Sequence, residues 1–277
     1  MDDSAVRMIC WNMAHRQDSW RRLLDMECDL ALLQEACRPP DDLAEKVDID
    51  PLPWPASERD SRVKWRSAIG VLSDRVAVEW LSAEPIGRAP YRHLAVSSPG
   101  TLTAARVRPR SGKPFIAVSM YAELESPLKG EGGWIFSDSS AHRLVSDLAV
   151  FVGRQHGHRI VAAGDLNLMR GYSADGSPYW AARYQTVFDR MEAMGLPCIG
   201  PQFPNGRQAE PWPEALPKDS LNVPTWHLPG RSPAGADRQL DYVFASRSMA
   251  DSLSVRALNE PGEWGPSDHC CIAIEAS

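Results

Sequence analysis

The chain has 277 residues, of which 43% are hydrophobic and 24% charged, with a formal net charge of -6. This composition is typical of a globular protein with a sizeable core, and the negative net charge excludes a global basic field that would attract nucleic acid or anionic membranes non-specifically. Any binding of a polyanion must therefore be local.

The sequence contains no pattern of a signal peptide and no apolar run long enough to span a bilayer. We therefore expect a cytoplasmic protein without a membrane span. Six cysteines are scattered along the chain without a C-x-x-C spacing, which predicts reduced thiols.

Short apolar runs rich in β-branched residues recur along the chain and predict ten strands. In chain order they cover residues 5–11, 29–35, 67–73, 76–81, 101–107, 115–121, 159–165, 239–246, 253–258 and 270–275. Helical periodicity is clearest over 137–155, where the Asp and Ser residues at 138–140 can cap the first turn. Weaker patterns predict helices over 19–26, 41–47 and 179–194.

Several of the predicted strands follow one another after short turns, without the regular intervening helices that a doubly wound parallel sheet requires. The pattern favours an α+β fold with two stacked, mostly antiparallel sheets and helices outside them. Proline-rich and glycine-rich segments at 50–62 and 197–238 are interpreted as surface loops, because strands that complete a sheet follow the second one. We therefore expect residues 1–277 to form one domain.

Polar side chains stand where several of these apolar strands end. Asn12 follows the first strand and Glu35 ends the second, and each taken alone is also compatible with a turn residue or a solvated carboxylate. Asp165 and Asn167 follow the strand "IVAAG", and alternation along an extended chain predicts that both face one side while Leu166 faces the other.

Two further segments carry candidate residues near the end of the chain. Asp241 lies inside "LDYVF" between apolar residues, so its buried carboxylate needs a partner to offset desolvation. Asp268 and His269 stand just ahead of the last strand. Together the carboxylates and amides predict a site for a hard divalent cation, Mg²⁺ or Mn²⁺, and the histidine beside them suits phosphoryl transfer.

The motifs that carry these residues resemble those of the endonuclease/exonuclease/phosphatase superfamily. The resemblance runs in order through "CWN" (10–12), "LLQE" (32–35), "GDLN" (164–167), "LDYVF" (240–244) and "SDH" (267–269), over nearly the full length. It implies the DNase I-like fold, a four-layered α/β/β/α sandwich with the site at the sheet edges.

The resemblance also implies a role for each matched residue. Glu35 is expected to be the principal metal ligand, with Asn12 and Asp268 beside it. Asp165 is expected to orient and deprotonate the attacking water, and Asn167 to donate to the phosphate.

The same resemblance covers four further residues. His269 is expected to contact the scissile phosphate, with Asp241 orienting its ring. Tyr121 stands where nuclease members carry a tyrosine, and Trp226, in "PTWH", is similar to a tryptophan that lines their substrate pocket; a packed core tryptophan is the other interpretation.

The sequence departs from the pattern of abasic-site nucleases at two places. Tyr121 is followed by Ala-Glu-Leu in place of Pro-Asn, and Ala14 stands where those nucleases have an acid that helps to hold the metal. His15 could be a substitute contact or an ordinary surface histidine.

Basic residues near the motifs bear on the substrate, because this fold hosts several chemistries. Residues 58–66 hold four basic residues around Trp65, residues 106–113 hold four more, and Arg170 follows "GDLN". They can belong to a solvated face, or they can bind phosphate while Trp65 or Trp226 stacks on a base. From this group we select Arg66, Arg170 and Trp226 as candidate substrate-binding residues.

The sequence as a whole favours a Mg²⁺- or Mn²⁺-dependent phosphodiesterase, foremost a nuclease that acts on DNA or RNA. Two alternatives stay open. One is a phosphatase or phosphodiesterase for a small phosphorylated molecule such as a nucleotide, an inositol phosphate or a lipid headgroup. The other is a binding module that retains the fold without catalysis.

Overall fold

A computed structural model describes residues 5–54, 65–90, 93–125, 137–152 and 157–277. One six-stranded sheet, sheet A, has the strand order β13-β14-β1-β2-β4-β3. Its strands are β1 (Val6–Asn12), β2 (Leu30–Ala36), β3 (Asp48–Ile49), β4 (Arg66–Val71), β13 (Leu253–Leu258) and β14 (Cys271–Ala276). The two ends of the chain therefore meet in this sheet.

A second six-stranded sheet, sheet B, has the order β11-β12-β10-β9-β8-β5. Its strands are β5 (Val76–Leu81), β8 (Leu102–Pro109), β9 (Phe115–Tyr121), β10 (Ile160–Asp165), β11 (Cys198–Gly200) and β12 (Asp241–Ala245). Between β5 and β8 in the chain, the strands β6 (Ala83–Pro85) and β7 (Leu94–Val96) form a separate two-stranded sheet.

Four α-helices and three short 3-10 helices complete the described part of the chain. The α-helices are α1 (Gln17–Leu24), α2 (Ser137–Leu148), α3 (Pro178–Ala193) and α4 (Arg247–Ala250). The 3-10 helices are η1 (Ala44–Lys46), η2 (Ala149–Phe151) and η3 (Pro233–Gly235).

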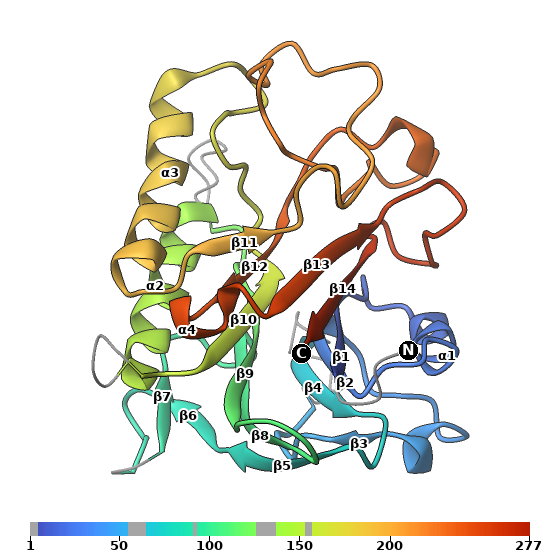
Figure 1. Ribbon diagram of the computed structural model, residues 1–277, viewed down its shortest axis with the longest axis vertical. Helices are drawn as coiled ribbons and strands as arrows, with labels where there is room; N and C mark the ends of the chain where they lie inside the picture. Colours follow the sequence, from blue (N-terminus) through green and yellow to red (C-terminus); the bar gives the residue numbers. More distant parts are fainter. Residues whose placement is uncertain (1–4, 55–64, 91–92, 126–136, 153–156) are drawn as a thin grey trace, which may run out of the picture.

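Three apolar clusters hold these elements together as layers. One lies between the sheets and joins Met8 and Leu32 of sheet A to Ala163 of sheet B. A second packs the outer face of sheet B against α2 and α3, and a third packs the outer face of sheet A against Trp20 of α1. Figure 1 shows α2 and α3 on one flank and α1 on the opposite one. The predicted mixed α+β fold of two sheets flanked by helices is confirmed.

Each sheet contains one parallel pair of strands among antiparallel neighbours, and these two pairs position the polar ends of the strands. β1 runs parallel to β2, and β10 runs parallel to β9. Because carboxyl ends of parallel strands meet at one edge, Asn12 lies beside the end of β2, and Asp165 lies opposite Tyr121. Asp241 pairs with Asp165 from the antiparallel strand β12.

Gly164 is required by the close approach of β10 and β9. A Cβ atom at this position would lie 1.8 Å from the carbonyl oxygen of Met120, a distance that real Cβ atoms do not show. Only glycine therefore lets the strand that carries Asp165 lie against β9.

The ten predicted strands all form, but some predicted helices differ. The segment over 41–47 forms only the short helix η1. Of the helix predicted over 137–155, α2 ends at Leu148 before η2, and residues 153–155 lie outside the described residues. The long segment 197–238 contains β11 and forms an isolated β-bridge between Trp226 and His269. This segment, predicted to be a surface loop, therefore contacts the residues that precede β14. Within the described ranges no helix is both long and apolar enough to cross a membrane. All six cysteines are free thiols, as predicted.

Candidate active site

The polar ends of the strands surround one open cavity of about 790 Å³. Seven of the residues predicted from the sequence line it: Glu35, Tyr121, Asp165, Asn167, Trp226, Asp268 and His269. Asn12 and Asp241 are each only 1% exposed and contact these residues from behind. The structure thus brings together nine of the eleven predicted side chains.

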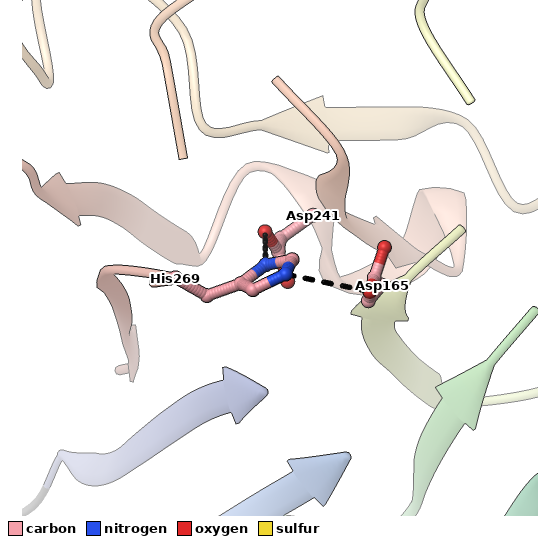
Figure 2. Close-up of side chains that lie close together, drawn as sticks. All are labelled: Asp165, Asp241 and His269. Carbon is pink, nitrogen blue, oxygen red and sulfur yellow. Dashed lines mark hydrogen bonds and ion pairs between the residues drawn. The ribbon is translucent and has the colours of Figure 1, made fainter. Parts of the chain in front are cut away.

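His269 lies between two buried carboxylates, as Figure 2 shows. Its Nδ1 is 2.8 Å from Oδ2 of Asp241, and its Nε2 is 3.8 Å from Oδ2 of Asp165. Burial opposes the charged ring, but the negative charges of Asp241 and Asp165 outweigh it and raise the pKa of His269 to about 10. The imidazole is therefore held as a cation at neutral pH.

Asp165 is the carboxylate that faces this cation across the cavity. Burial raises its pKa to about 7, although the positive charge of His269 acts in the opposite direction. Its Oδ1 accepts a hydrogen bond from the backbone N–H of Asn167 at 2.8 Å, and its Oδ2 accepts one from Nδ2 of Asn12 at 2.9 Å. These bonds fix a carboxylate that can take up a proton near neutral pH.

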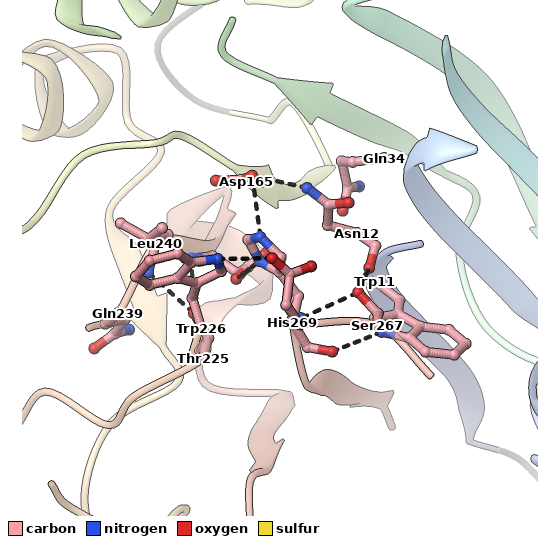
Figure 3. A network of polar contacts seen from close by, with 12 residues as sticks. Trp11, Asn12, Gln34, Asp165, Thr225, Trp226, Gln239, Leu240, Ser267 and His269 are labelled. Carbon is pink, nitrogen blue, oxygen red and sulfur yellow. Dashed lines mark hydrogen bonds and ion pairs between the residues drawn. The ribbon is translucent and has the colours of Figure 1, made fainter. Parts of the chain in front are cut away.

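Hydrogen bonds from sheet A and from the long segment before β12 hold His269 and the start of β12 in place; Figure 3 shows Trp11, Thr225 and His269. The hydroxyl of Thr225 accepts hydrogen bonds from the backbone N–H groups of Leu240 and Asp241. The indole of Trp11 donates to the carbonyl of His269 at 2.9 Å. The pair is thus rigid before any substrate binds.

Glu35 occupies the other side of the cavity. Its Oε2 is 2.8 Å from Nε2 of His15, and its Oε1 accepts a bond from Asn12 at 3.3 Å. Burial disfavours the charge, but the bonds from His15, Tyr121 and Asn12 outweigh it, and the pKa of Glu35 lies below its ordinary value. The carboxylate is therefore ionised at neutral pH.

Asn167 faces the cavity together with Asp165, but for a different reason from the one expected. Strand β10 ends at Asp165, and Asn167 has a positive φ of 50° in the turn closed by the Asp165 carboxylate. Leu166 points into the core, as predicted. The shared face is therefore produced by a turn and not by continued strand alternation.

Tyr121 and Asp268 complete the set of predicted catalytic and metal-binding residues. Burial and the charges of Glu35 and Asp165 raise the pKa of Tyr121, so its hydroxyl remains a neutral donor. Oδ2 of Asp268 accepts a hydrogen bond from the indole of Trp226 at 3.0 Å. Trp226 lines the cavity and also packs, partly buried, against the apolar cluster that contains Leu240, so both interpretations of this residue hold.

Two predicted substrate-binding residues lie elsewhere. Arg66 is 2% exposed, and its guanidinium donates to both carboxylate oxygens of Asp50 and lies over the ring of Trp54. Arg170 extends over the ring of Phe188, which is on α3. Neither side chain lines the cavity, because each is used in packing.

Of the other basic residues in these two segments, those that the structure describes do not line the cavity. Arg106 and Arg108 pair with Glu79, and Arg110 pairs with Asp74, on an exposed strand edge. Arg59, Arg62 and Lys64 lie outside the described residues.

The cavity instead has basic residues that the sequence analysis did not select: Arg16, His227 and Arg238. The guanidinium of Arg238 lies 5.2 Å from the centroid of the Trp226 ring. Arg238 stands three residues before Asp241, and His227 directly follows Trp226. Their proximity to the matched motifs was the available signal.

No family model matches the sequence, and no curated protein matches it. Solved structures do match. An AP endonuclease from Leishmania major has a TM-score of 0.63 at 15% identity and covers 100% of this chain and 89% of its own. The endonuclease domain of TRAS1, a telomere-specific non-LTR retrotransposon, has a TM-score of 0.61 at 16% identity, with 98% of both chains covered.

A 3' phosphatase from Neisseria, NExo, bound to product DNA hairpin, has a TM-score of 0.58 at 19% identity and covers 98% of this chain and 99% of its own. The chain has the DNase I-like fold. The resemblance read from the five motifs is thus matched by the backbone.

The DNase I-like fold explains why residues far apart in the sequence are neighbours. Asn12 and Glu35 come from the parallel pair of sheet A, whereas Asp165 comes from the parallel pair of sheet B. The bond between Asn12 and Asp165 therefore joins the two sheets at the floor of the cavity.

The donor set of this site fits a divalent cation. Asp165, Asp241 and His269 could together hold a metal ion, since one ligand atom of each lies within 4.8 Å of the others. A protonated His269, however, has no free lone pair for a metal, so the cluster also fits a charged proton donor. Glu35 and Asp268 supply further carboxylate oxygens to the same cavity.

Proposed function

We propose that this protein is a Mg²⁺- or Mn²⁺-dependent phosphoric ester hydrolase that cuts phosphodiester bonds of nucleic acid. One observation carries the proposal. An imidazolium paired with the buried Asp241 faces the fixed carboxylate of Asp165 in the same cavity as the ionised Glu35. Hydrolysis of a phosphate ester needs these three functions: a base for water, a cation for the phosphate oxygens, and a metal ligand.

Asp165 is proposed to orient a water molecule and to accept its proton as the water attacks phosphorus. Its two oxygens already accept bonds from Asn167 and Asn12, so the carboxylate is fixed before the substrate binds. Donors aimed at the place where charge develops need no reorganisation during the reaction.

His269 is proposed to donate to a non-bridging phosphate oxygen as negative charge accumulates there. Asp241 keeps the ring charged and oriented through Nδ1, which leaves the Nε2 proton free for the phosphate. The neutral hydroxyl of Tyr121 and the amide of Asn167 offer further donors at the cavity wall.

Glu35 is proposed as the principal ligand of the divalent cation, with Asp268 and the amide of Asn12 beside it. A bound Mg²⁺ or Mn²⁺ would neutralise phosphate oxygens and the departing alkoxide. In the described structure Asn12 donates to two carboxylates, so its contribution is to orient them.

Nucleic acid is preferred as the substrate for two reasons. The three structural neighbours described above are named as two endonucleases and a 3' phosphatase bound to DNA. Trp226, with Arg238 over its ring, provides an aromatic and cationic wall of the kind that binds a base and its phosphate.

A small phosphorylated molecule is the second candidate. The net charge of -6 and the ion-paired arginines on the β5–β8 edge favour it, because they leave few cations for a long duplex. A binding module without catalysis is the third candidate, although Asp165, His269 and Glu35 all line the cavity.

A hydrolysis panel tests the proposal. Purified protein is incubated with Mg²⁺ or Mn²⁺ and with single-stranded, duplex and abasic DNA, RNA, phosphoinositides and cyclic dinucleotides. We expect turnover on a nucleic acid that EDTA abolishes and that Asp165→Asn and His269→Ala each lower by at least about 100-fold. Turnover only on the small molecules selects the second candidate. No turnover on any substrate, or equal rates for the wild type and both variants, contradicts the enzymatic proposal.

A further inference from the structure

His15 stands against the proposed metal ligand. Its Nε2 lies 2.8 Å from Oε2 of Glu35, and its side chain is 44% exposed. Both residues line the cavity. The centroids of the His15 and Trp65 rings are 6.1 Å apart. His15 and Glu35 are therefore in contact with each other and accessible from the same cavity.

The backbone adopts an uncommon conformation to place this imidazole. Ala14 and His15 both have positive φ angles, 46° and 57°, although neither is glycine. Oδ1 of Asn12 accepts a bond from the N–H of Ala14, and the N–H of His15 donates to the carbonyl of Glu35 at 3.1 Å. Because left-handed backbone at non-glycine residues is costly, its concentration beside Glu35 points to a functional placement.

The spacing of the two side-chain atoms suits a shared ion. Two ligands that each lie about 2.1 Å from one cation at a right angle are about 3 Å apart. Nε2 of His15 and Oε2 of Glu35 are 2.8 Å apart. A small rotation of either side chain would therefore let both atoms bind the same ion.

We propose that Nε2 of His15 is a ligand of the divalent cation held by Glu35, and that this nitrogen gives the site a preference for Mn²⁺ over Mg²⁺. The inference rests on the proposed function, because it assumes that Glu35 holds the metal. Imidazole suits first-row transition ions, whereas Mg²⁺ prefers sites made only of oxygen. Water and substrate phosphate would occupy the remaining positions.

An ordinary ion pair is the competing explanation of the same contact. In that case a cationic His15 would neutralise Glu35 and compete with every divalent ion alike. Removing His15 would then strengthen the binding of Mn²⁺ and Mg²⁺ together. The two explanations thus predict opposite changes in Mn²⁺ affinity.

Direct metal binding separates them without reference to turnover. Protein stripped with EDTA is titrated with Mn²⁺ and with Mg²⁺ by calorimetry, as wild type, His15→Ala, Glu35→Gln and the control His227→Ala. His227 lines the same cavity and uses Nδ1 toward the carbonyl of Leu228, so it controls for loss of a neighbouring imidazole. We expect His15→Ala to lower Mn²⁺ affinity by at least about tenfold, as even outer-shell changes do, with Mg²⁺ affinity unchanged or higher.

A spectroscopic measurement gives a second readout. Pulsed electron paramagnetic resonance of the Mn²⁺-loaded protein detects nuclear modulation from a coordinated ¹⁴N. We expect this modulation in the wild type and in His227→Ala, and its absence in His15→Ala. Circular dichroism confirms folding of the His15 variant, whose side chain is half-exposed.

The outcomes are distinguishable from those of the proposed function. Mn²⁺ affinity of His15→Ala equal to or above the wild-type value, or equal losses for both ions, overturns the inference while the hydrolase proposal stands. No binding of either ion to the wild type overturns both the inference and the proposed metal dependence. Loss of Mn²⁺ binding in Glu35→Gln together with the selective loss in His15→Ala supports both.

Discussion

The pairing of Asp241 with His269 decides the chemistry of the site at the scale of single residues. Asp241 contributes no atom to the cavity surface, and one of its oxygens, Oδ1, has no hydrogen-bond partner among the described residues. Its other oxygen holds Nδ1 of the histidine at 2.8 Å. We therefore expect Asp241 to act as a positioning residue, through the imidazole.

Asp241→Asn should lower kcat by on the order of 100-fold or more while the protein stays folded. The pKa of His269, about 10 in the wild type, should fall because the main compensating charge is gone. The alkaline limb of the pH–rate profile should then move to lower pH. A profile measured from acid to alkaline pH checks this.

Asp219→Asn serves as the matched control, because Asp219 is exposed and lies outside the cavity. Its profile should equal that of the wild type. A reduced rate in Asp241→Asn with an unmoved alkaline limb would show that Asp241 has only a structural role.

The polar residues inside the five motifs predicted the lining of the cavity better than the basic residues outside the motifs did. The need of a buried carboxylate for a partner singled out Asp241, whereas the roles of Asp165 and His269 came from the resemblance of their motifs to a known superfamily. Arg66 and Arg170 were selected by their distance from a motif, which does not show the direction of a long side chain, and neither lines the cavity. The partners that decide these directions, Asp50 and Phe188, are remote in the sequence.

At the scale of elements, the contact between β10 and β9 limits which residues β10 can carry just before Asp165, the proposed base. Gly164→Ala should lower the free energy of unfolding by about 3 kcal/mol or more, since the added Cβ meets backbone that cannot move aside. Gly262→Ala is the control, because a Cβ there has no atom within 4 Å. Urea unfolding of both variants measures the difference. Equal stabilities would contradict the described strand spacing.

The interface between α2 and α3 should be sensitive to pH through His142. Burial and Arg190, which donates to its Nδ1, lower the pKa of this histidine from 6.5. The unfolded chain thus binds the proton more strongly, so this group favours folding fully above 6.5 and progressively less as pH falls toward the lowered value. The free energy of unfolding should decrease accordingly on acidification.

His142→Gln should remove this part of the pH dependence. Chemical unfolding at about pH 7.5 and about pH 5.5 gives the loss of stability for the wild type and the variant. The wild type should lose more than the variant. Identical losses would show that protonation of His142 does not affect the packing of the helices.

Strands were more predictable than helices because their signals are local. Alternating or continuous apolar runs with β-branched residues gave all ten main strands. The segment over 41–47 has a helical pattern of composition, yet only Ala44–Lys46 form a turn of 3-10 helix. Leu43 and Val47 there pack on sheet A, and this tertiary contact overrides a weak propensity. The short strand β11 depends on pairing with β12 and had no comparable signal.

At the scale of the whole molecule, the distribution of charge sets the expected salt dependence. The net charge is -6, and the described cavity has two arginines, Arg16 and Arg238. If both contact a single-stranded substrate, the logarithm of its affinity should fall with the logarithm of salt concentration with a slope of about -1.4.

Arg238→Gln should reduce the magnitude of this slope by about 0.7, because one phosphate contact is lost. Arg231→Gln is the control, since Arg231 is exposed on the same loop and does not line the cavity. Binding of a catalytically inactive Asp165→Asn background to a labelled oligonucleotide at several salt concentrations gives the slopes. If the slope for Arg238→Gln equals that of the unsubstituted background, Arg238 does not contact a phosphate of the oligonucleotide.

Sheet A is built from both ends of the chain, since Val6 pairs with Ala276 across β1 and β14. During synthesis on a ribosome, β1 can pair with β2 early but gains its antiparallel partner only after Cys271–Ala276 have emerged. His269 stands just ahead of β14, so its pair with Asp241 forms equally late. The same adjacency makes the protein suitable for circular permutation, in which a short linker joins the original ends and new termini open in a distant surface loop.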